Sequence, residues 1–479
     1  MSYQLFVTTL ATGTVAASVL ISPAVLAETL SSAKPEIVVT AARTSQTVDE
    51  TLAPVSVITR EDIIRLQVNS VAEVLKMTPS VSFSSSGGFG SNHSFSIRGT
   101  NSDHVLVLID GVPAGSSTLG TIGFEYLPIT QIERIEVVRG PRSSLYGANA
   151  IGGIIQVFTR KGGEPETRLN AGYGTDNSRE FFANRSGGNE TSTYNIGFNY
   201  FASDGYNFVG DYGPDLDDDA YENYSLSLNG SHQFSEQFKL SGTFLRTEGT
   251  AEFDGYNYID TRTDNTQQVI TAVADYAVND RWNSQLQLGR SDDKNHNYLH
   301  DDPVSNPFTE TETTFDTQRD NIIWKNDISI RDSDLLTLGL DYQNDSVDSS
   351  VDYAEESRWN RAAFAQYLYY GDTLDAQLSF RHDNNQAYGS NNSWNIGLGY
   401  PLSESVRLTG TYGTAFKAPN FNDLYWPNDG FFTGNKDLQP EESSSFDVGL
   451  DFTTGPAKWS AHYFNTQIDN LIAYFFVPY

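Results

Sequence analysis

The feature that most constrains the fold is an alternation of apolar and polar residues that recurs after about Arg168. Tyr194–Tyr200 reads YNIGFNY, and Trp394–Tyr400 reads WNIGLGY. Successive side chains of a β-strand point to opposite faces, so this period of two predicts strands with one apolar and one polar face. In a soluble sandwich the apolar face would form the core, whereas in a membrane barrel it would face lipid. The alternation alone leaves both possibilities open.

The pattern supplies about fifteen or sixteen strand-like segments, each near the ~9–11 residues that span a bilayer. Short connections alternate with longer polar ones. In a membrane barrel four of the longer ones would be extracellular loops: GPDLDDD, NYIDTRTDN, HDDPVSNP and NDGFFTGNKD. The 26 Tyr and 28 Phe residues suit the aromatic girdles of a membrane barrel. Mean hydropathy is −0.40, and no 18-residue apolar run follows the first 27 residues, which argues against a helical membrane protein.

A different pattern precedes the alternating region. Val105–Ile109, Ile132–Val138 and Ile154–Thr159 are short runs rich in Val and Ile, separated by glycines and prolines that turn the chain. Thr59 can cap a helix with Asp62 as its capping-box partner, and a second helix is predicted over Ser70–Met77. These elements predict a compact α+β domain ahead of the barrel.

Several motifs of the two regions match a known family. The first region contains IRGT, LIDGVP, ERIEVVRGPRSSLYG and AIGGIIQVFTRKGG, and the second contains GTAFKAPNFNDLY and NKDLQPEESSSFDVGL. The chain resembles the TonB-dependent outer-membrane receptors, and within that family the receptors for vitamin B12 (cobalamin). The resemblance implies a membrane all-β protein of the bacterial outer membrane. Its large antiparallel transmembrane β-barrel, of about 22 strands when complete, would be filled by an N-terminal α+β plug. The sequence stops in the middle of the alternating pattern, so we expect C-terminal strands to be missing.

The resemblance divides the chain into four parts. Residues 1–27 are predicted to be a signal peptide, although no Lys or Arg precedes Lys34. Residues 28–45 form an extended segment with the TonB box, 46–163 the plug domain, and 164–479 the barrel. The box comprises Glu36, Ile37, Val38, Val39, Thr40 and Ala41. Such a segment can add as a strand to the sheet of the partner TonB, and the alternative is that it forms the first strand of the plug.

The negative charge of the chain favours binding of cations. With 30 Lys+Arg and 61 Asp+Glu the net charge is −31, which disfavours nucleic acid. Clustered carboxylates without histidine or cysteine suit calcium, although most charge runs are solvated loops. In the vitamin B12 receptors paired acidic loops hold calcium, and the resemblance assigns that role to Asp215, Asp217, Asp219, Asp254 and Asp260. Asn207 and Phe253 depart from the family pattern. His296 and His300 are predicted to share a loop with Asp301 and Asp302 and are a weaker transition-metal candidate.

The expected function is TonB-dependent active transport of cobalamin, with calcium assisting binding and with no enzymatic activity. The resemblance predicts ligand contacts on two apical loops, at Asn92, Ser94, Asn101, Leu119 and Gly120. Polar donors with a few apolar contacts would fit a large amphipathic ligand. The expected partners are TonB, the ligand and outer-membrane lipid, and we expect a monomer. Alternatives are a receptor for a ferric siderophore or haem and, in another class, a passive porin or adhesin, which would need no TonB box.

Overall fold

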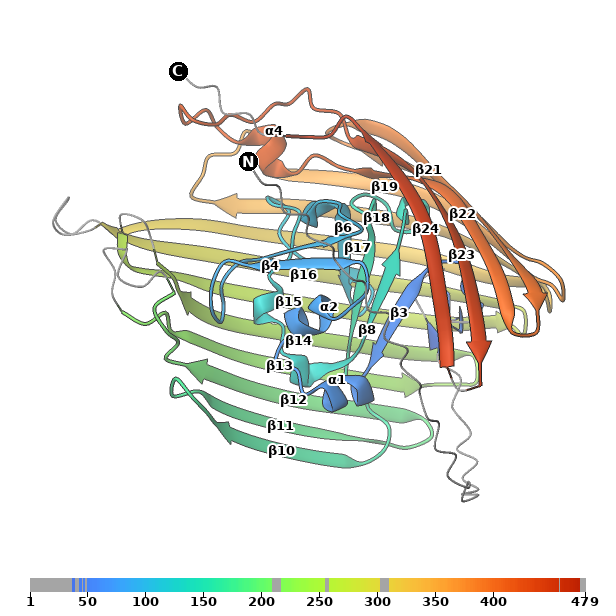
Figure 1. Cartoon of the computed structure of the whole chain (residues 1–479), viewed down its shortest axis with the longest axis horizontal. Helices are drawn as coiled ribbons and strands as arrows, with labels where there is room; N and C mark the ends of the chain where they lie inside the picture. The colour runs from blue at the N-terminus through green and yellow to red at the C-terminus, as the bar shows by residue number, and fades with distance from the viewer. Residues whose placement is uncertain are drawn as a thin grey trace, which may run out of the picture. The chain divides into compact units, whose positions relative to one another are not determined.

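The computed structural model describes residues 37–38, 43–44, 46–47, 50–208, 217–254, 258–301, 310–455 and 457–473. These residues belong to one compact unit, Ile37–Tyr479. The predicted signal peptide lies outside them. The unit consists of an N-terminal domain, the expected plug, and a large antiparallel sheet that curves around it (Figure 1).

A five-stranded sheet forms the centre of the plug, with strand order β3-β8-β9-β6-β7. Its strands are β3 (Val55–Thr59), β6 (Val105–Ile109), β7 (Val112–Pro113), β8 (Ile132–Arg139) and β9 (Gly153–Thr159). β6 and β9 are parallel, and the other pairs are antiparallel. The three predicted apolar runs are therefore strands, and they are almost entirely buried because the sheet is covered on both faces.

Short helices and a hairpin complete the plug. Thr59 and Asp62 form the predicted capping box at the start of α1 (Arg60–Leu66), and Ser70 caps α2 (Val71–Lys76). The predicted range of the second helix, Ser70–Met77, therefore consists of α2 and its two cap residues. The hairpin of β4 (Val81–Ser85) and β5 (His93–Ile97) carries a glycine- and serine-rich loop, residues 86–92. The remaining elements are α3 (Ser143–Tyr146), η1 (Ser102–His104), η2 (Phe124–Tyr126) and η3 (Ile129–Gln131).

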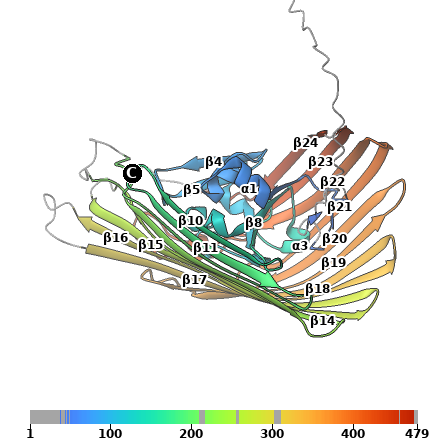
Figure 2. The ribbon, with the colours of Figure 1, turned by 90° about the horizontal axis from the view of Figure 1, so that it is seen from below.

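The second part is an antiparallel sheet for which the described residues give 15 strands, each paired with the next in sequence. Short and longer connections alternate along most of the sheet, as expected, although the connections on both sides of β20 and β21 are short. The described ends β10 and β24 are not paired with each other, and the sheet wraps partway round the plug (Figure 2). The strands are β10 (Glu166–Tyr173), β11 (Arg179–Gly188), β12 (Ser192–Ser203), β13 (Tyr221–Gln233), β14 (Phe238–Glu252), β15 (Tyr258–Asn279), β16 (Trp282–Asp301), β17 (Glu310–Arg331), β18 (Asp334–Ser349), β19 (Ser357–Tyr370), β20 (Asp375–Asn385), β21 (Gly389–Ser403), β22 (Val406–Lys417), β23 (Glu441–Thr454) and β24 (Ala457–Asp469).

The two faces of this sheet settle the question that the alternation left open. On β21, Trp394 and Ile396 are exposed, whereas Ser393 and Asn395 are buried against the interior. The same inversion recurs along β23, where Phe446 and Val448 are exposed. Polar side chains face the plug and apolar side chains face outward, which is the arrangement of a membrane barrel and the reverse of a soluble sandwich. None of the helices in the described residues is long and apolar enough to span a membrane.

Most of the strands are longer than the expected ~9–11 residues, and three exceed it most. β15 and β17 each have 22 residues and β16 has 20. The sequence NYIDTRTDN, predicted as a loop, is instead strand from Tyr258 onward, and His296 and His300 lie within β16 rather than on a loop. The backbone pairing of β15 with β16 continues through this polar region. Strand hydrogen bonds do not depend on an apolar face, so the sequence pattern underestimates these strands.

Candidate ligand-binding site

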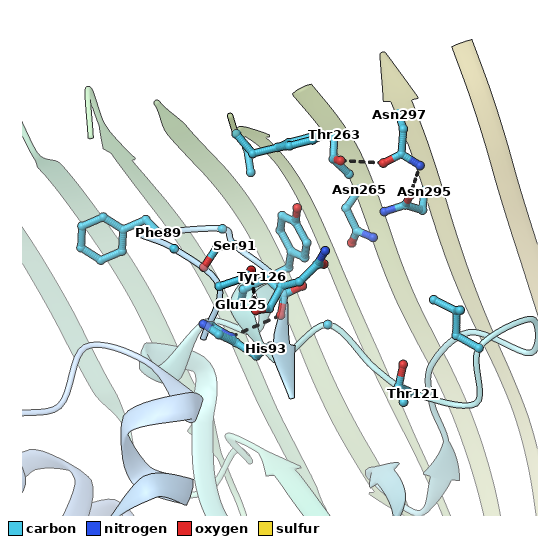
Figure 3. A pocket seen from close by; sticks show the side chains of 18 of the residues that line it. Phe89, Ser91, His93, Thr121, Glu125, Tyr126, Thr263, Asn265, Asn295 and Asn297 are labelled. Atoms are coloured by element: carbon cyan, nitrogen blue, oxygen red, sulfur yellow. Dashed lines mark hydrogen bonds and ion pairs between the residues drawn. The ribbon is translucent and has the colours of Figure 1, made fainter. Parts of the chain in front are cut away.

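A cavity of about 530 Å³ opens at the end of the sheet that carries the longer connections. The glycine-rich loop between β4 and β5 and the plug segment Ser116–Tyr126 form one side of it, and the ends of β14, β15 and β16 form the other. We call it the apical cavity. Figure 3 shows the plug side chains and the strand side chains facing one another across it.

The lip of the apical cavity is aromatic. Phe89, at the tip of the glycine-rich loop, is 45% exposed, and its ring packs edge-on against Phe201 of β12 with centroids 5.0 Å apart. Gly90 beside it has φ +74, and a Cβ there would meet the Tyr221 ring at 2.4 Å. The loop can approach the wall this closely only because residue 90 is glycine. Phe89 therefore offers an apolar surface that a ligand can cover.

Amides and hydroxyls line the strand side of the cavity. Thr263 Oγ1 donates to Asn297 Oδ1 over 2.7 Å, and Asn297 Nδ2 donates to Asn295 Oδ1 over 2.7 Å (Figure 3). Asn265 lies one inward position further along β15. Residues two apart on a strand share a face, so these amides form a row of neutral donors and acceptors.

The plug side of the cavity holds a buried acidic group. Glu125 Oε2 lies 3.4 Å from His93 Nδ1, and the two side chains are only 7% and 11% exposed. Tyr221 of the barrel donates its hydroxyl to the backbone carbonyl of Glu125 over 2.8 Å, which ties this segment to the wall. Burial, reinforced by Glu125, raises the pKa of Tyr126, so that phenol stays neutral.

The charges around the cavity have one sign. Among the described residues no Lys or Arg lines it, and His93 is its only titratable base. The carboxylates that line it are Glu125, Asp219, Glu252, Asp254 and Asp293. A carboxylate-rich, partly enclosed site favours neutral or cationic ligands over anions, because the field of like charges is concentrated between low-dielectric walls.

The predicted ligand contacts divide between two places. Asn92 and Leu119 line the apical cavity. Ser94, Asn101 and Gly120 do not. The Ser94 hydroxyl is hydrogen-bonded to that of Ser102 at 3.0 Å, Asn101 is the N-cap residue of η1, and Gly120 donates its N–H to the Ser116 carbonyl over 2.8 Å.

The predicted calcium ligands are only partly described. Asp215 lies outside the described residues, as does the side chain of Asp260. Asp217 is exposed, whereas Asp219 and Asp254 both line the apical cavity although 35 positions separate them in sequence. Phe208 donates its N–H to Asp219 over 3.1 Å. The described residues contain no group of three or more His, Asp or Glu side chains arranged to hold a metal.

The other sequence candidates are placed as follows. Ile37 and Val38 of the predicted TonB box form β1 (Ile37–Val38), which pairs with β2 (Gln46–Thr47), while Glu36, Val39, Thr40 and Ala41 lie outside the described residues. His296 Nε2 lies 2.9 Å from Asp316 Oδ1 across the β16–β17 pair. The side chain of Asp301 and the whole of Asp302 lie outside the described residues.

Sequence reasoning missed most of the cavity, namely Phe89, His93, Glu125, Asn265, Asn295 and Asn297. One usable signal was present, since Asn295 and Asn297 are two residues apart and would share a face of any strand. Placing this region in a loop concealed that signal.

Comparison with known proteins identifies the class. Residues 47–154 match the TonB-dependent receptor plug domain, and residues 145–479 match the TonB-dependent receptor-like β-barrel. The chain belongs to the TonB-dependent receptors, which are β-barrel proteins of the outer membrane and transport a substrate with the help of TonB. The exposed apolar residues of the sheet match the outward-facing apolar band of such barrels.

Similar proteins include vitamin B12 transporters. The chain is 34% identical over 443 residues to the vitamin B12 transporter BtuB of Photobacterium profundum, covering 91% of this chain and 70% of that protein. It is 32% identical to BtuB of Vibrio vulnificus, covering 86% and 67%. Solved structures with the same fold include the ferric enterobactin receptor PfeA of Pseudomonas aeruginosa (TM-score 0.73, 19% identity, covering 87% and 71%). The siderophore receptor PirA of Acinetobacter baumannii is another (0.71, 20%, covering 86% and 70%).

Proposed function

We propose that this receptor transports vitamin B12 (cobalamin). The observation that carries the proposal is the chemistry of the apical cavity, which combines an aromatic lip, a row of neutral amides and several carboxylates, with no Lys or Arg among its described lining residues. Cobalamin is large and amphipathic and has many peripheral amide groups. Neutral donors and acceptors with a few apolar contacts match such a ligand.

The charge of the cavity also bears on the alternative ligands. Ferric catecholate siderophores and haem are anionic, and proteins recognise such groups with Arg and Lys. Anionic ligands would meet Glu125 and Asp293 in this cavity without a lining Lys or Arg to balance them. The siderophore receptors of similar structure are about 20% identical, so their likeness concerns the fold alone.

Calcium at the acidic loops forms part of the proposal. Asp219 and Asp254 come from different connections yet line one cavity, and carboxylate oxygens are the ligands that calcium prefers. Bound calcium would neutralise these carboxylates and hold the two loops together beside the ligand. Asp217 lies two residues before Asp219 in the connection between β12 and β13, so its carboxylate could also bind the calcium.

A binding comparison tests the function. Detergent-solubilised receptor is titrated with cyanocobalamin, ferric enterobactin and haem, and we expect binding of cyanocobalamin alone. Asn297→Ala should weaken that binding about fivefold to tenfold, since a neutral hydrogen bond contributes roughly 1 kcal/mol. Asn326→Ala is the matched control, because that amide is bonded to Trp282 on the outer face. Preferential binding of an anionic iron complex would refute the proposed ligand.

A further inference from the structure

A second cavity, of about 650 Å³, lies between the plug and the same wall. Its lining combines hydroxyls and amides, among them Gln156 of the plug and Ser241 and Thr271 of the barrel, with charges of both signs. The charged lining residues are Arg43, Lys161, Lys239, Lys325, Asp110, Asp275 and Asp327. We call it the basal cavity. Arg43 and Thr44 also line it, and they directly follow the predicted TonB box. Moving that segment would remove part of the wall of the basal cavity.

The two cavities lie one beyond the other on the same strands. On β15, Asn265 lines the apical cavity and Thr271 the basal one. On β16, Asn295 and Gln287 do so in the same way. Each pair is separated by an even number of residues, so all four side chains lie on the inward face. A layer of plug residues, hydrogen-bonded to these strands at Gln267, Gln287 and Ser291, lies between the two cavities.

That layer is the plug segment Gly111–Gly123, which we call the gate segment. Three neutral hydrogen bonds join it to β15 and β16. Gln287 Nε2 donates to the Gly111 carbonyl over 3.1 Å, Ser291 Oγ to that of Pro113 over 2.8 Å, and Gln267 Nε2 to that of Gly123 over 2.9 Å.

Apolar contacts and a few more hydrogen bonds complete this attachment. Val112 and Ile122 belong to one buried cluster with Leu245 of β14 and Val269 of β15. At the tip of the segment Arg319 of β17 donates to Ser117 Oγ over 3.3 Å. No ion pair joins the plug to β14, β15 or β16 in the described part of the chain.

The other side of the plug is held by buried charges. His104 Nε2 lies 2.7 Å from Glu441 Oε2 of β23, and Lys417 Nζ of β22 lies 2.8 Å from Asp103 Oδ2. Arg98 is paired with Asp447 of β23. Figure 2 shows β15 to β17 and β21 to β24 on different sides of the plug. Separating a buried ion pair leaves uncompensated charges, so this side resists opening far more than the gate segment, whose described contacts with the wall include no ion pair.

We propose that the basal cavity is a second, exit-side ligand site. Ligand reaches it from the apical cavity when the gate segment moves away from β14, β15 and β16, while the plug stays attached to β22 and β23. The hydroxyls and amides of the basal cavity can form hydrogen bonds with the same amide-bearing class of ligand, and its positive and negative side chains together give it no single sign of charge. The path itself requires only that the chain transports a ligand, and the choice of cyanocobalamin as probe rests on the proposed function.

Paired cysteines can lock each side, because the natural chain has no cysteine. A Cβ at Gly289 of β16 would lie 3.4 Å from Val112 Cβ, close to the usual separation in a disulfide, so Val112→Cys with Gly289→Cys locks the gate segment. Ser144→Cys with Ser379→Cys is the matched lock on the other side, where the two hydroxyls are 2.8 Å apart. Cells carrying each variant are assayed for binding and uptake of labelled cyanocobalamin, with and without reductant.

We expect the 112–289 disulfide to reduce uptake at least tenfold, with recovery on reduction and unchanged surface binding. The 144–379 disulfide should leave more than half of the uptake. Uptake blocked by both locks or by neither would overturn the proposal. Absence of cyanocobalamin binding to the unmodified receptor would count against the proposed function instead. In that case the path is tested by maleimide labelling of Ser291→Cys and Ser379→Cys, where TonB should accelerate labelling only at position 291, and equal effects at both positions would overturn the path.

Discussion

His104 of the plug and Glu441 of β23 face each other at 2.7 Å, between Nε2 and Oε2, and both side chains are 1% exposed. Glu441 also accepts from Lys417 Nζ over 3.2 Å through its other oxygen. Residues 337 positions apart thus share one buried network that joins plug and barrel. Removal of one member leaves the others buried without their partner.

Glu441→Ala should therefore lower the free energy of unfolding by about 3–5 kcal/mol. Urea unfolding of the detergent-solubilised receptor measures this change. Glu442→Ala is the control. The Glu442 side chain is exposed, so this substitution should change the free energy of unfolding by less than about 0.5 kcal/mol. Similar losses for the two variants would show that the network contributes little.

Asp110 should make the stability of the plug depend on pH. Burial raises the pKa of Asp110, although Thr159 partly opposes this by donating its N–H over 3.1 Å and its hydroxyl over 2.6 Å. The folded plug therefore binds the Asp110 proton more tightly than the unfolded chain does. Stability should fall as pH rises from about 3.9, the ordinary value for Asp, to the raised pKa, and stay level above it.

Hydrogen exchange of the β6 amides across this pH range measures the free energy of opening. The free energy of opening should depend less on pH in Asp110→Asn than in the natural chain. Asp372→Asn, in an exposed turn, is the control and should show the same pH dependence as the natural chain. If the free energy of opening changes with pH equally in Asp110→Asn and in the natural chain, Asp110 is not the cause of the pH dependence.

Val38→Pro should abolish cobalamin uptake and leave surface binding intact. Proline removes the backbone N–H that a segment needs when it adds as a strand to a partner sheet. Val38→Ala keeps the N–H and should retain uptake. Uptake and binding of labelled cyanocobalamin by whole cells distinguish the two effects, and undiminished transport by Val38→Pro would refute the TonB-box assignment.

Calcium should strengthen ligand binding if the acidic loops hold it. Calcium and ligand would then be positively coupled by roughly 1–3 kcal/mol, so chelation should weaken cyanocobalamin binding about fivefold to hundredfold. Asp219→Asn with Asp254→Asn should weaken binding similarly and abolish the effect of the chelator.

Asp280→Asn, in the short turn between β15 and β16, should keep the calcium dependence of the natural receptor. Coincident binding curves for the unmutated receptor with calcium and with chelator would mean that the acidic loops are only a solvated rim.

The sequence by itself determined the local elements. The capping pair of Thr59 and Asp62 marks the first helix of the plug, and the period of two marks the strands, because backbone geometry alone fixes both patterns. The motifs on the plug and barrel also identified the family, which the comparisons confirm.

Only the tertiary structure decided which face of each strand turns inward and which residues meet in the apical cavity. The polar stretch around Asn295 and Asn297 is part of a strand because β15 and β17 pair with it, although its sequence has no apolar face that would predict a strand. Phe89, Glu125 and Asn297 are brought together by the wrapping of the sheet around the plug. Such contacts depend on long-range register, which local periodicity does not encode.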